Sequence, residues 1–237
     1  ERVGVALERK PFAIGVRIEH PQALIDRARW GDCAGHPLLG AAEYKLVHHA
    51  GNGRCVYSFC MCPGGFVVGA TSEPGRVVTN GMSQHSRNER NANSGLVIPV
   101  SDDDLEPHER FQGDPLAGMA FQRVLEGRAF ELGGGDYSAP IQRLEDLLEG
   151  RASTRVGSVA PSYQPGVRPA DLADLLPASM IAALREALPV FAKQLSGYDH
   201  PDAVLTAIET RTSSPLRIPR DQALESINVQ GLTPAGE

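Results

Sequence analysis

The sequence has no long run of lysine or arginine, and no apolar run of the length that a membrane span requires. Its formal net charge is −6, from 23 basic and 29 acidic residues. Because nucleic acids and acidic membrane surfaces are bound through basic patches, this charge argues against both kinds of partner. Four cysteines at irregular spacing make no disulfide framework in a chain of 237 residues, so we expect reduced thiols and a cytoplasmic location.

Two motifs that would identify a site directly are also missing. No GxGxxG string follows an expected strand, so the sequence lacks the fingerprint of a dinucleotide-binding turn. The Cys60-x-Cys62 spacing is shorter than the paired-cysteine units of structural zinc sites, and we therefore expect no metal.

The sequence does contain enough apolar residues, 41% of the chain, to bury a substantial core. Alternation and short apolar runs predict strands over 12–19, 44–49, 55–62, 66–72, 77–80, 96–100 and 203–209. Helical periodicity and its start signals predict helices over 21–30, 114–132, 138–150 and 178–196. We predict an α+β fold in which an antiparallel β meander is joined to a helical subdomain.

The composition changes to Ser, Pro, Gly and Arg over residues 151–170, which predicts a linker or a mobile loop. This segment would separate a β-rich domain with two helices, at 1–150, from residues 171–237. The latter part would hold a helical segment and strands that return along the domain.

The stretch from Cys55 to Val68 is the most informative. Alternation places Cys60 and Cys62 on one face of a strand and the large Tyr57, Phe59 and Met61 on the opposite, core-facing side. The Pro63-Gly64-Gly65 triplet that follows predicts a turn whose bare backbone can approach a ligand closely.

Three other polar features each have a functional and an ordinary interpretation. Arg17 lies on the polar face of its strand, which either borders a ligand or is simply solvated. Residues 80–94 are rich in Asn, Ser, Arg and His, and form either a ligand-binding loop or a self-satisfied surface loop. Residues 209–218 place two arginines around three hydroxyl residues, which either bind a carboxylate or phosphate or form a surface turn.

Four strings of the sequence are long and gapless: KPFAIGVRIEHP, YSFCMCPGGFVV, TNGMSQHSRNERNANSG and ETRTSSPLRI. They resemble the bacterial family of FAD-dependent dehydrogenases, also described as NAD(FAD)-utilising dehydrogenases. The resemblance implies that a Rossmann-type FAD domain is split around this region, with its glycine motif before it and its last strand after it. Because the chain begins at Glu1 and lacks that motif, it is expected to be an excised middle portion without most of the FAD site.

The resemblance and the polar features together predict the substrate-facing domain of an FAD-dependent oxidoreductase. NAD(P)H is a possible electron donor, and the isolated chain is expected to bind FAD weakly or not at all. The partners implied are a small-molecule substrate, expected to be anionic, and the missing FAD domain, towards which the strands of residues 171–237 would return. The predicted site residues are catalytic Cys60, Cys62 and Arg211; cofactor-binding Pro63, Gly64, Gly65, Gly236 and Glu237; and substrate-binding Arg17, Asn80, His85, Arg87, Thr212 and Arg217.

Two alternatives stay open. The same loops could grip a ligand or partner domain without catalysis, and Cys60 and Cys62 could be simply buried or packed against a substrate rather than redox-active. We expect Arg211 to serve substrate binding rather than folding, because a long cationic side chain on a Ser-Pro turn suits a cleft better than a core.

Overall fold

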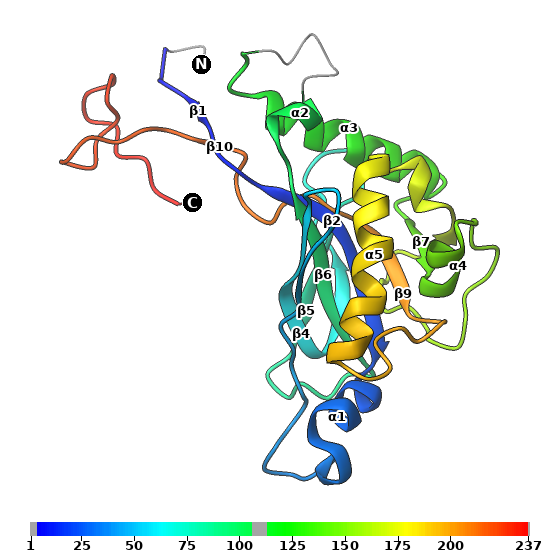
Figure 1. Cartoon of the computed structure of the whole chain (residues 1–237). Coiled ribbons are helices and arrows are strands. Elements are labelled where there is room, and N and C mark those ends of the chain that lie inside the picture. The colour runs from blue at the N-terminus through cyan, green and yellow to red at the C-terminus, as the bar shows by residue number, and fades with distance from the viewer. Residues whose placement is uncertain (1–3, 106–112, 237) are drawn as a thin grey trace.

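The computed structural model describes residues 4–105 and 113–236, and these form the expected α+β fold with a mostly antiparallel sheet (Figure 1). The strands are β1 (Glu8–Arg9), β2 (Ala13–Pro21), β3 (Val47–His49), β4 (Cys55–Gly69), β5 (Thr79–Ser83), β6 (Asn91–Pro99), β7 (Ala139–Arg143), β8 (Val167–Pro169), β9 (Val204–Glu209) and β10 (Leu216–Arg217). The α-helices are α1 (Gln22–Trp30), α2 (Asp102–Leu105), α3 (Ala117–Leu132), α4 (Leu144–Glu149) and α5 (Ala178–Gln194), with short 3-10 turns at Gly31–Cys33 and Leu172–Asp174.

The main sheet has the strand order β3-β4-β6-β2-β9-β7-β8, and β5 pairs with β4 outside this path. Neighbouring strands are antiparallel except β7 and β8, which run parallel. The order brings β2 and β9 together from opposite ends of the chain, with Arg17 opposite Thr206. The predicted antiparallel sheet is therefore confirmed, although its central pairing joins distant segments.

The apolar core lies between one face of this sheet and α5, which runs along it in Figure 1. Ile14, Val16 and Ile18 alternate along β2 and are fully buried on that face. On α5, Leu184 and Leu188 are buried at helical spacing. These two elements confirm the periodicity that predicted a strand over 12–19 and a helix over 178–196.

Two element predictions are wrong. Residues 139–143 form strand β7 rather than the start of a helix, because Ile141 pairs with Thr206 of β9 on one side and Pro169 of β8 on the other. The helix begins only at Leu144. The predicted polar loop 80–94 is also shorter, since β5 and β6 take up both of its ends.

Strand β4 does not turn at Pro63-Gly64-Gly65 as predicted, but continues for 15 residues. Its pairing with β6 shifts register between Phe59 and Cys62 and again between Cys62 and Gly65. Cys60 and Gly64 have positive φ angles of 43° and 46° at these irregularities. Because β-bulges bend and twist a strand, the second half of β4 curls and carries β5 against β2 and β9.

The curled strands β2, β6, β4, β5 and β9 enclose a second interior on the sheet face away from the apolar core; we call it the polar interior. At Gly81 of β5, a Cβ atom would collide with Arg17 Nη1 and Asn93 Oδ1. Only glycine therefore allows β5 to approach so closely. This interior positions Arg17 and Asn80, two of the predicted site residues.

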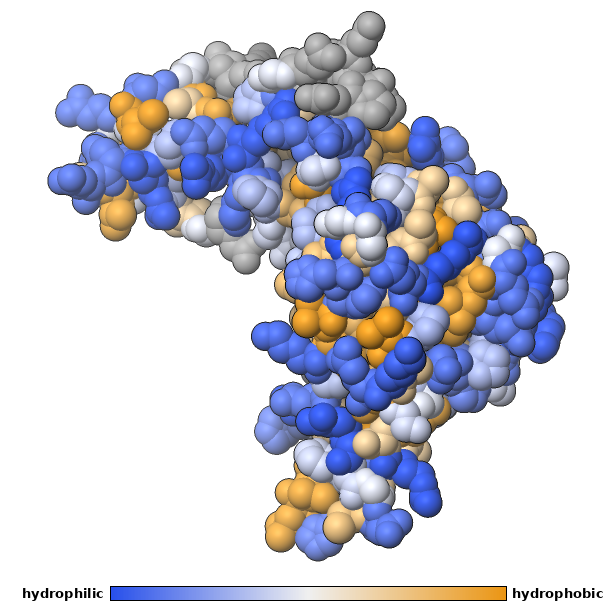
Figure 2. Space-filling view, viewed as in Figure 1, coloured by the Kyte–Doolittle hydropathy of each residue, from blue (hydrophilic) through white to orange (hydrophobic). Residues whose placement is uncertain are grey.

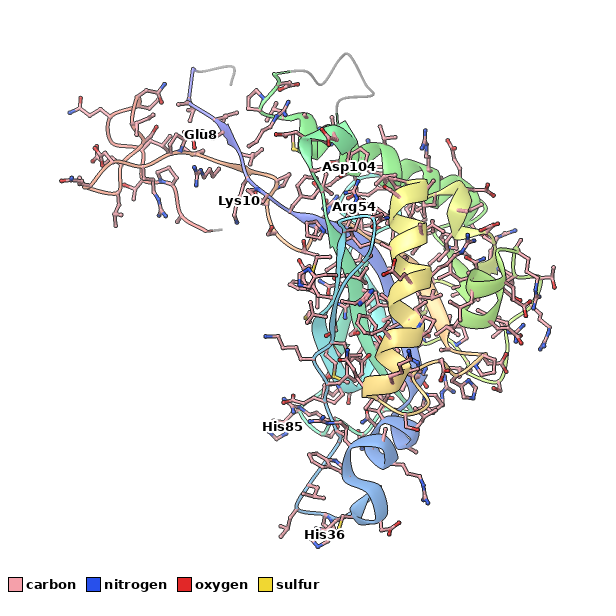
Figure 3. The ribbon with its side chains drawn as sticks, viewed as in Figure 1. Glu8, Lys10, His36, Arg54, His85 and Asp104 are labelled. Atoms are coloured by element: carbon pink, nitrogen blue, oxygen red, sulfur yellow. The ribbon has the colours of Figure 1, made fainter. Side chains whose placement is uncertain are left out.

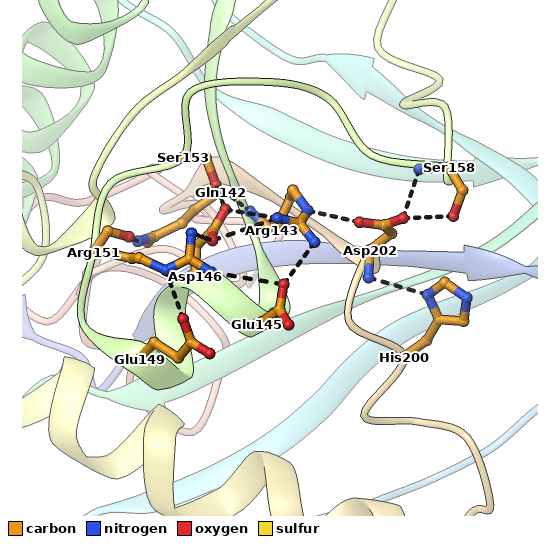
Figure 4. Close-up of polar contacts among 10 residues, drawn as sticks. All are labelled: Gln142, Arg143, Glu145, Asp146, Glu149, Arg151, Ser153, Ser158, His200 and Asp202. Carbon is orange, nitrogen blue, oxygen red and sulfur yellow. Dashed lines mark hydrogen bonds and ion pairs between the residues drawn. The ribbon is translucent and has the colours of Figure 1, made fainter.

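The segment 151–170 packs onto β7 and β9 through a cluster of charges around Arg143 (Figure 4). Arg143 donates to Asp202 at 2.6 Å and contacts Asp146 at 3.3 Å. Ser153 Oγ donates to Asp146 at 2.6 Å, and Ser158 donates to Asp202 through its N–H and hydroxyl at 2.9 and 2.7 Å. Charge-assisted hydrogen bonds thus attach the first half of this segment to the body.

Strands β1 and β10 pair apart from the main sheet and form an arm, defined here as residues 4–10 and 215–236 (Figure 1). Glu8 lies opposite Arg217 in this ribbon. Asn228 links the two ends of the arm, because its Nδ2 donates to Gly4 O at 2.6 Å and its Oδ1 accepts from Ala6 N at 2.9 Å. The chain consequently enters and leaves the body at one place.

Candidate functional site

Arg17 occupies the centre of the polar interior, and its side chain is fully buried. Its Nη2 donates to Glu209 Oε1 at 3.0 Å and to Asn80 Oδ1 at 3.0 Å, while its Nε donates to Glu209 Oε2. Its Nη1 donates to the Cys60 carbonyl at 2.8 Å and to Asn93 Oδ1 at 3.2 Å. The interpretation of Arg17 as part of a solvated strand face is therefore wrong, because β4 and β5 curl over it.

These contacts use all five N–H donors of the guanidinium and reach β4, β5, β6 and β9. Burial alone would lower the pKa of Arg17, but attraction and hydrogen bonding to Glu209 outweigh it and raise the pKa. Arg17 is thus a buried cation whose hydrogen bonds hold the curled strands together. No donor of its side chain is left for a substrate.

The two predicted catalytic cysteines do not share a strand face. Cys60 is exposed, whereas Cys62 is buried and its thiol donates to the Cys60 carbonyl at 3.2 Å. The bulge between Phe59 and Cys62 breaks the alternation on which the prediction rested. Ahead of this bulge, Val56 rather than the partly exposed Tyr57 joins the apolar core, whereas Met61 packs against that core as predicted.

Burial raises the pKa of the Cys62 thiol to about 11, although the nearby Arg17 charge opposes this. A thiol with so high a pKa is almost entirely protonated at neutral pH, whereas the thiolate is the reactive form. This environment suits a packed, inert cysteine better than a redox partner of a flavin.

We expect iodoacetamide to modify Cys60 and to leave Cys62 unmodified in the folded chain at pH 7.5, because only Cys60 is exposed and Cys62 is protonated. Mass mapping after timed alkylation measures both sites, with the urea-unfolded chain as the control in which they react alike. Equal modification of both cysteines in the folded chain would restore the dithiol interpretation.

The Pro63-Gly64-Gly65 triplet packs against protein rather than against open space. A Cβ on Gly64 would collide with the carbonyl of Arg87, and its N–H donates to Gln22 Oε1 at 2.6 Å. Ser83 Oγ donates to the Pro63 carbonyl at 2.8 Å. The close backbone approach predicted for these glycines exists, but it is made to the β5–β6 connection.

Arg211 lies at the wall of a pocket of about 350 Å³ between α3 and residues 211–216. Its Nε and Nη2 donate to Glu126 Oε1 and Oε2 at 3.0 and 2.9 Å, and its Nη1 donates to Ser72 Oγ at 2.6 Å. Glu126 is fully buried and also accepts a 2.7 Å hydrogen bond from the Thr210 hydroxyl. Arg211 therefore borders a pocket, as expected, but it also neutralises a buried carboxylate.

The remaining predicted residues fall in three other places. Thr212 turns inward, where its hydroxyl donates to the Ala13 carbonyl at 2.9 Å. Arg217 pairs with Glu8 and, with Gly236, lines a pocket of about 640 Å³ in the arm. Glu237 lies outside the described residues.

The loop between β5 and β6 carries His85 and Arg87, and both side chains are exposed. Figure 3 shows His85 at the end of the molecule that also carries His36, far from Glu8 and Lys10 on the arm. The structure therefore brings together Arg17, Asn80, Cys60 and Cys62, but it separates this group from the loop and from the arm.

Sequence reasoning missed Glu209 and Glu126 as organising carboxylates, whereas Glu19 was expected on the polar face of its strand with Arg17. Glu209 pairs with Arg17, Glu126 pairs with Arg211, and the buried Glu19 accepts hydrogen bonds from Asn91 Nδ2 at 2.9 Å and Ser162 Oγ at 2.5 Å. The usable signal was a charged residue inside an apolar strand or helix stripe. Such residues are seldom buried without a partner.

The described residues do not fit a complete FAD site. The pyrophosphate of a dinucleotide is bound at a glycine-rich turn leading into a helix N-terminus. Strand β2 passes into α1 through Pro21, β6 passes into α2 through Val100 and Ser101, and β7 passes into α4 at Leu144, so none of these three junctions among the described residues has that turn. Within the same residues, no cluster of three His, Cys, Asp or Glu side chains suits a metal ion, and no helix has the length and apolar character to cross a membrane.

These observations define the class of structure: an α+β domain with a curled sheet, a charged interior and an arm that joins its first and last described residues. Residues 11–212 match the family described as FAD-dependent protein, C-terminal domain-like, and the chain belongs to that family. It is also 51% identical over 238 residues to an uncharacterized protein of Clostridium beijerinckii. That match covers 100% of this chain and 44% of the relative, so the chain spans less than half of the relative's length.

Proposed function

We propose that this chain is the substrate-facing domain of an FAD-dependent oxidoreductase, and that another part of a longer protein holds most of the cofactor. The arm is the observation that carries the proposal. Because β1 and β10 run side by side, the chain enters and leaves the body together, as a domain inserted into another domain must. Membership of an FAD-dependent family supplies the cofactor that the described residues cannot hold alone.

The surface of the arm suits contact with such a neighbouring domain. Leu224 and Ile227 are 56% and 57% exposed there, and apolar side chains are visible on the arm in Figure 2. The arm pocket has a basic lining that includes Arg217 and Arg220. Apolar anchors beside cationic groups fit a surface that packs on a domain carrying an anionic cofactor.

In this proposal the FAD, when bound, supplies the hydride chemistry and is reduced by the substrate; NAD(P)H is the electron donor only if the reaction runs in the opposite direction. This chain binds and orients the substrate in the pocket between α3 and residues 211–216. Arg211 is held there by Glu126 and Ser72, so its orientation is fixed before any ligand arrives. The free cysteines suit a reducing compartment such as the cytoplasm.

A binding module without catalysis is the second candidate, and two observations favour it. All donors of Arg17 are engaged, and the Cys62 thiol is protonated at neutral pH. Neither group can therefore act on a substrate in the arrangement described here.

The test compares the isolated chain with the longer protein from the same source. We expect the isolated chain to bind FAD at least a hundredfold more weakly, and the longer protein to be purified with bound flavin. In the longer protein, Met119→Trp should fill the pocket and slow flavin reduction by substrate turnover at least tenfold. Val47→Ser, at an exposed position of β3, is the control. A longer protein without flavin would refute the proposal. A flavoprotein whose rate of flavin reduction is unchanged by Met119→Trp would favour the binding module.

A further inference from the structure

We propose that the pocket between α3 and residues 211–216, called here the α3 pocket, takes an uncharged ligand that offers a hydrogen-bond donor beside an apolar group. This departs from the expectation of an anionic substrate. Its role as a substrate pocket rests on the proposed function, whereas the class of ligand rests on the charges and hydrogen bonds described below.

The charged side chains that line the α3 pocket form two neutral pairs. Arg211 binds both carboxylate oxygens of Glu126, at 3.0 and 2.9 Å. Arg123 binds Glu73 Oε1 through Nε at 3.0 Å and through Nη2 at 2.9 Å. The four lining residues carry no net formal charge, and a further cation bound to them, Arg76, holds the other oxygen of Glu73 at 2.9 Å from outside the lining. The wall of the pocket itself therefore has no excess positive charge with which to attract an anion.

Arg211 spends three of its five N–H donors on Glu126 and Ser72, so an anionic ligand would have to bind the remaining donors beside the Glu126 carboxylate or displace that carboxylate. Glu126 is fully buried, while Arg211 is 35% exposed. Drawing Arg211 away would leave a buried carboxylate with the Thr210 hydroxyl as its side-chain partner, and an unpaired buried charge is strongly unfavourable. The pocket thus disfavours carboxylate ligands, although Arg211 was predicted from the sequence to bind one.

Two of the three hydroxyl groups on residues 212–214 are also unavailable, and the third, that of Ser213, makes only a long contact of 3.4 Å with the Pro11 carbonyl. The Thr212 hydroxyl donates to the Ala13 carbonyl at 2.9 Å, and the Ser214 hydroxyl donates to the Leu216 carbonyl at 2.7 Å. Each therefore satisfies backbone rather than facing the pocket as a free donor. A ligand therefore meets a wall on which Thr212 and Ser214 offer no free hydroxyl donor.

Gln122, by contrast, provides a hydrogen-bond acceptor that is free within the described part of the chain. Its Nε2 donates to the Thr210 carbonyl at 2.7 Å, which fixes the amide, and among the described residues no donor reaches its Oε1. Gln122 lines the pocket together with the apolar Met119, Pro215 and Leu216. A fixed acceptor beside apolar walls recognises a ligand that carries an N–H or O–H next to an apolar part.

The volume agrees with a small molecule of this class. About 350 Å³ lies at the lower end of the roughly 300–1,000 Å³ usual for small-molecule sites. Ligands that fill such a space through one polar contact and several apolar ones bind weakly as fragments, so a sensitive measurement is needed.

The experiment titrates the isotope-labelled isolated chain with benzamide and with benzoate, two probes of nearly equal shape that differ in charge. Two-dimensional NMR follows the side-chain amide of Gln122 and the Nε–H of Arg211. We expect benzamide to shift the Gln122 signal and to bind at least tenfold more tightly than benzoate. The Arg211 signal should stay in place, because its contact with Glu126 is kept.

Met119→Trp fills the pocket and should abolish the benzamide shifts, whereas His85→Ala, at the exposed β5–β6 loop, should leave them unchanged. Tighter binding of benzoate, or shifts from neither probe, would overturn the proposed ligand class. If benzamide binds as expected but Met119→Trp leaves flavin reduction in the longer protein unaffected, the substrate role fails while the ligand class stands.

Discussion

Replacing Arg17 by methionine is expected to lower the free energy of unfolding by about 4 kcal/mol, or to prevent folding altogether. The variant removes five hydrogen bonds from the polar interior and leaves Glu209, whose side chain is 2% exposed, without its counter-ion. Breaking a buried ion pair from one side costs about 3–5 kcal/mol, since an uncompensated charge stays in the interior. Urea denaturation followed by circular dichroism measures the change.

A second variant keeps this prediction testable if Arg17→Met does not fold. The double variant Arg17→Met with Glu209→Leu removes both charges, and apolar replacement of a whole buried pair is often nearly neutral. We therefore expect it to regain most of the lost stability. Arg168→Met, which breaks an Arg168–Asp136 pair with both side chains 53% exposed, is the matched control and should cost less than about 1 kcal/mol. A similarly small loss for Arg17→Met would show that the interior does not depend on its arginine.

The elements that the sequence predicted are those decided by local periodicity. The buried faces of β2 and α5 can be read from spacings of two and of three to four residues. Strand β4 could not be predicted in this way, because its bulges at Cys60 and Gly64 depend on pairing with β5 and β6. The bulge between Phe59 and Cys62 breaks the alternation between the two cysteines, so the error about the cysteines follows directly from the error about the strand.

The candidate site likewise divides into residues that local sequence predicts and partners that only strand pairing brings together. Arg17, Asn80, Cys60 and Cys62 were each predicted from local chemistry, and the structure places Arg17, Asn80, Cys62 and the Cys60 carbonyl in one interior, with the Cys60 thiol exposed. Their organising partner was not predictable, because Glu209 is 192 positions from Arg17 and only the pairing of β2 with β9 brings them together. An arginine and a glutamate on separate apolar strands are weak evidence of a pair until the strand order is known.

Arg211→Ala is expected to lower the free energy of unfolding by about 3 kcal/mol, in contrast to the small effect that its place on a Ser-Pro turn suggested. The reason is Glu126, which is fully buried and receives two hydrogen bonds from Arg211. Without the guanidinium, the carboxylate keeps only the Thr210 hydroxyl among its side-chain partners. The expected cost is at the lower end of that for a broken buried pair, because Arg211 is 35% exposed and water can partly replace it.

A double-mutant cycle measures the coupling free energy of the Arg211–Glu126 pair. It uses thermal and urea unfolding of Arg211→Ala, Glu126→Gln and the double variant. Glu126→Gln preserves the shape of the side chain and removes its charge, so Arg211→Ala should cost much less in that background. A coupling free energy of at least about 1 kcal/mol between the two positions would establish the structural role. If Arg211→Ala costs less than about 1 kcal/mol and couples weakly to Glu126, then water satisfies the carboxylate. Arg211 would in that case be free to bind an anion, and the argument for an uncharged ligand in the α3 pocket would lose its main support.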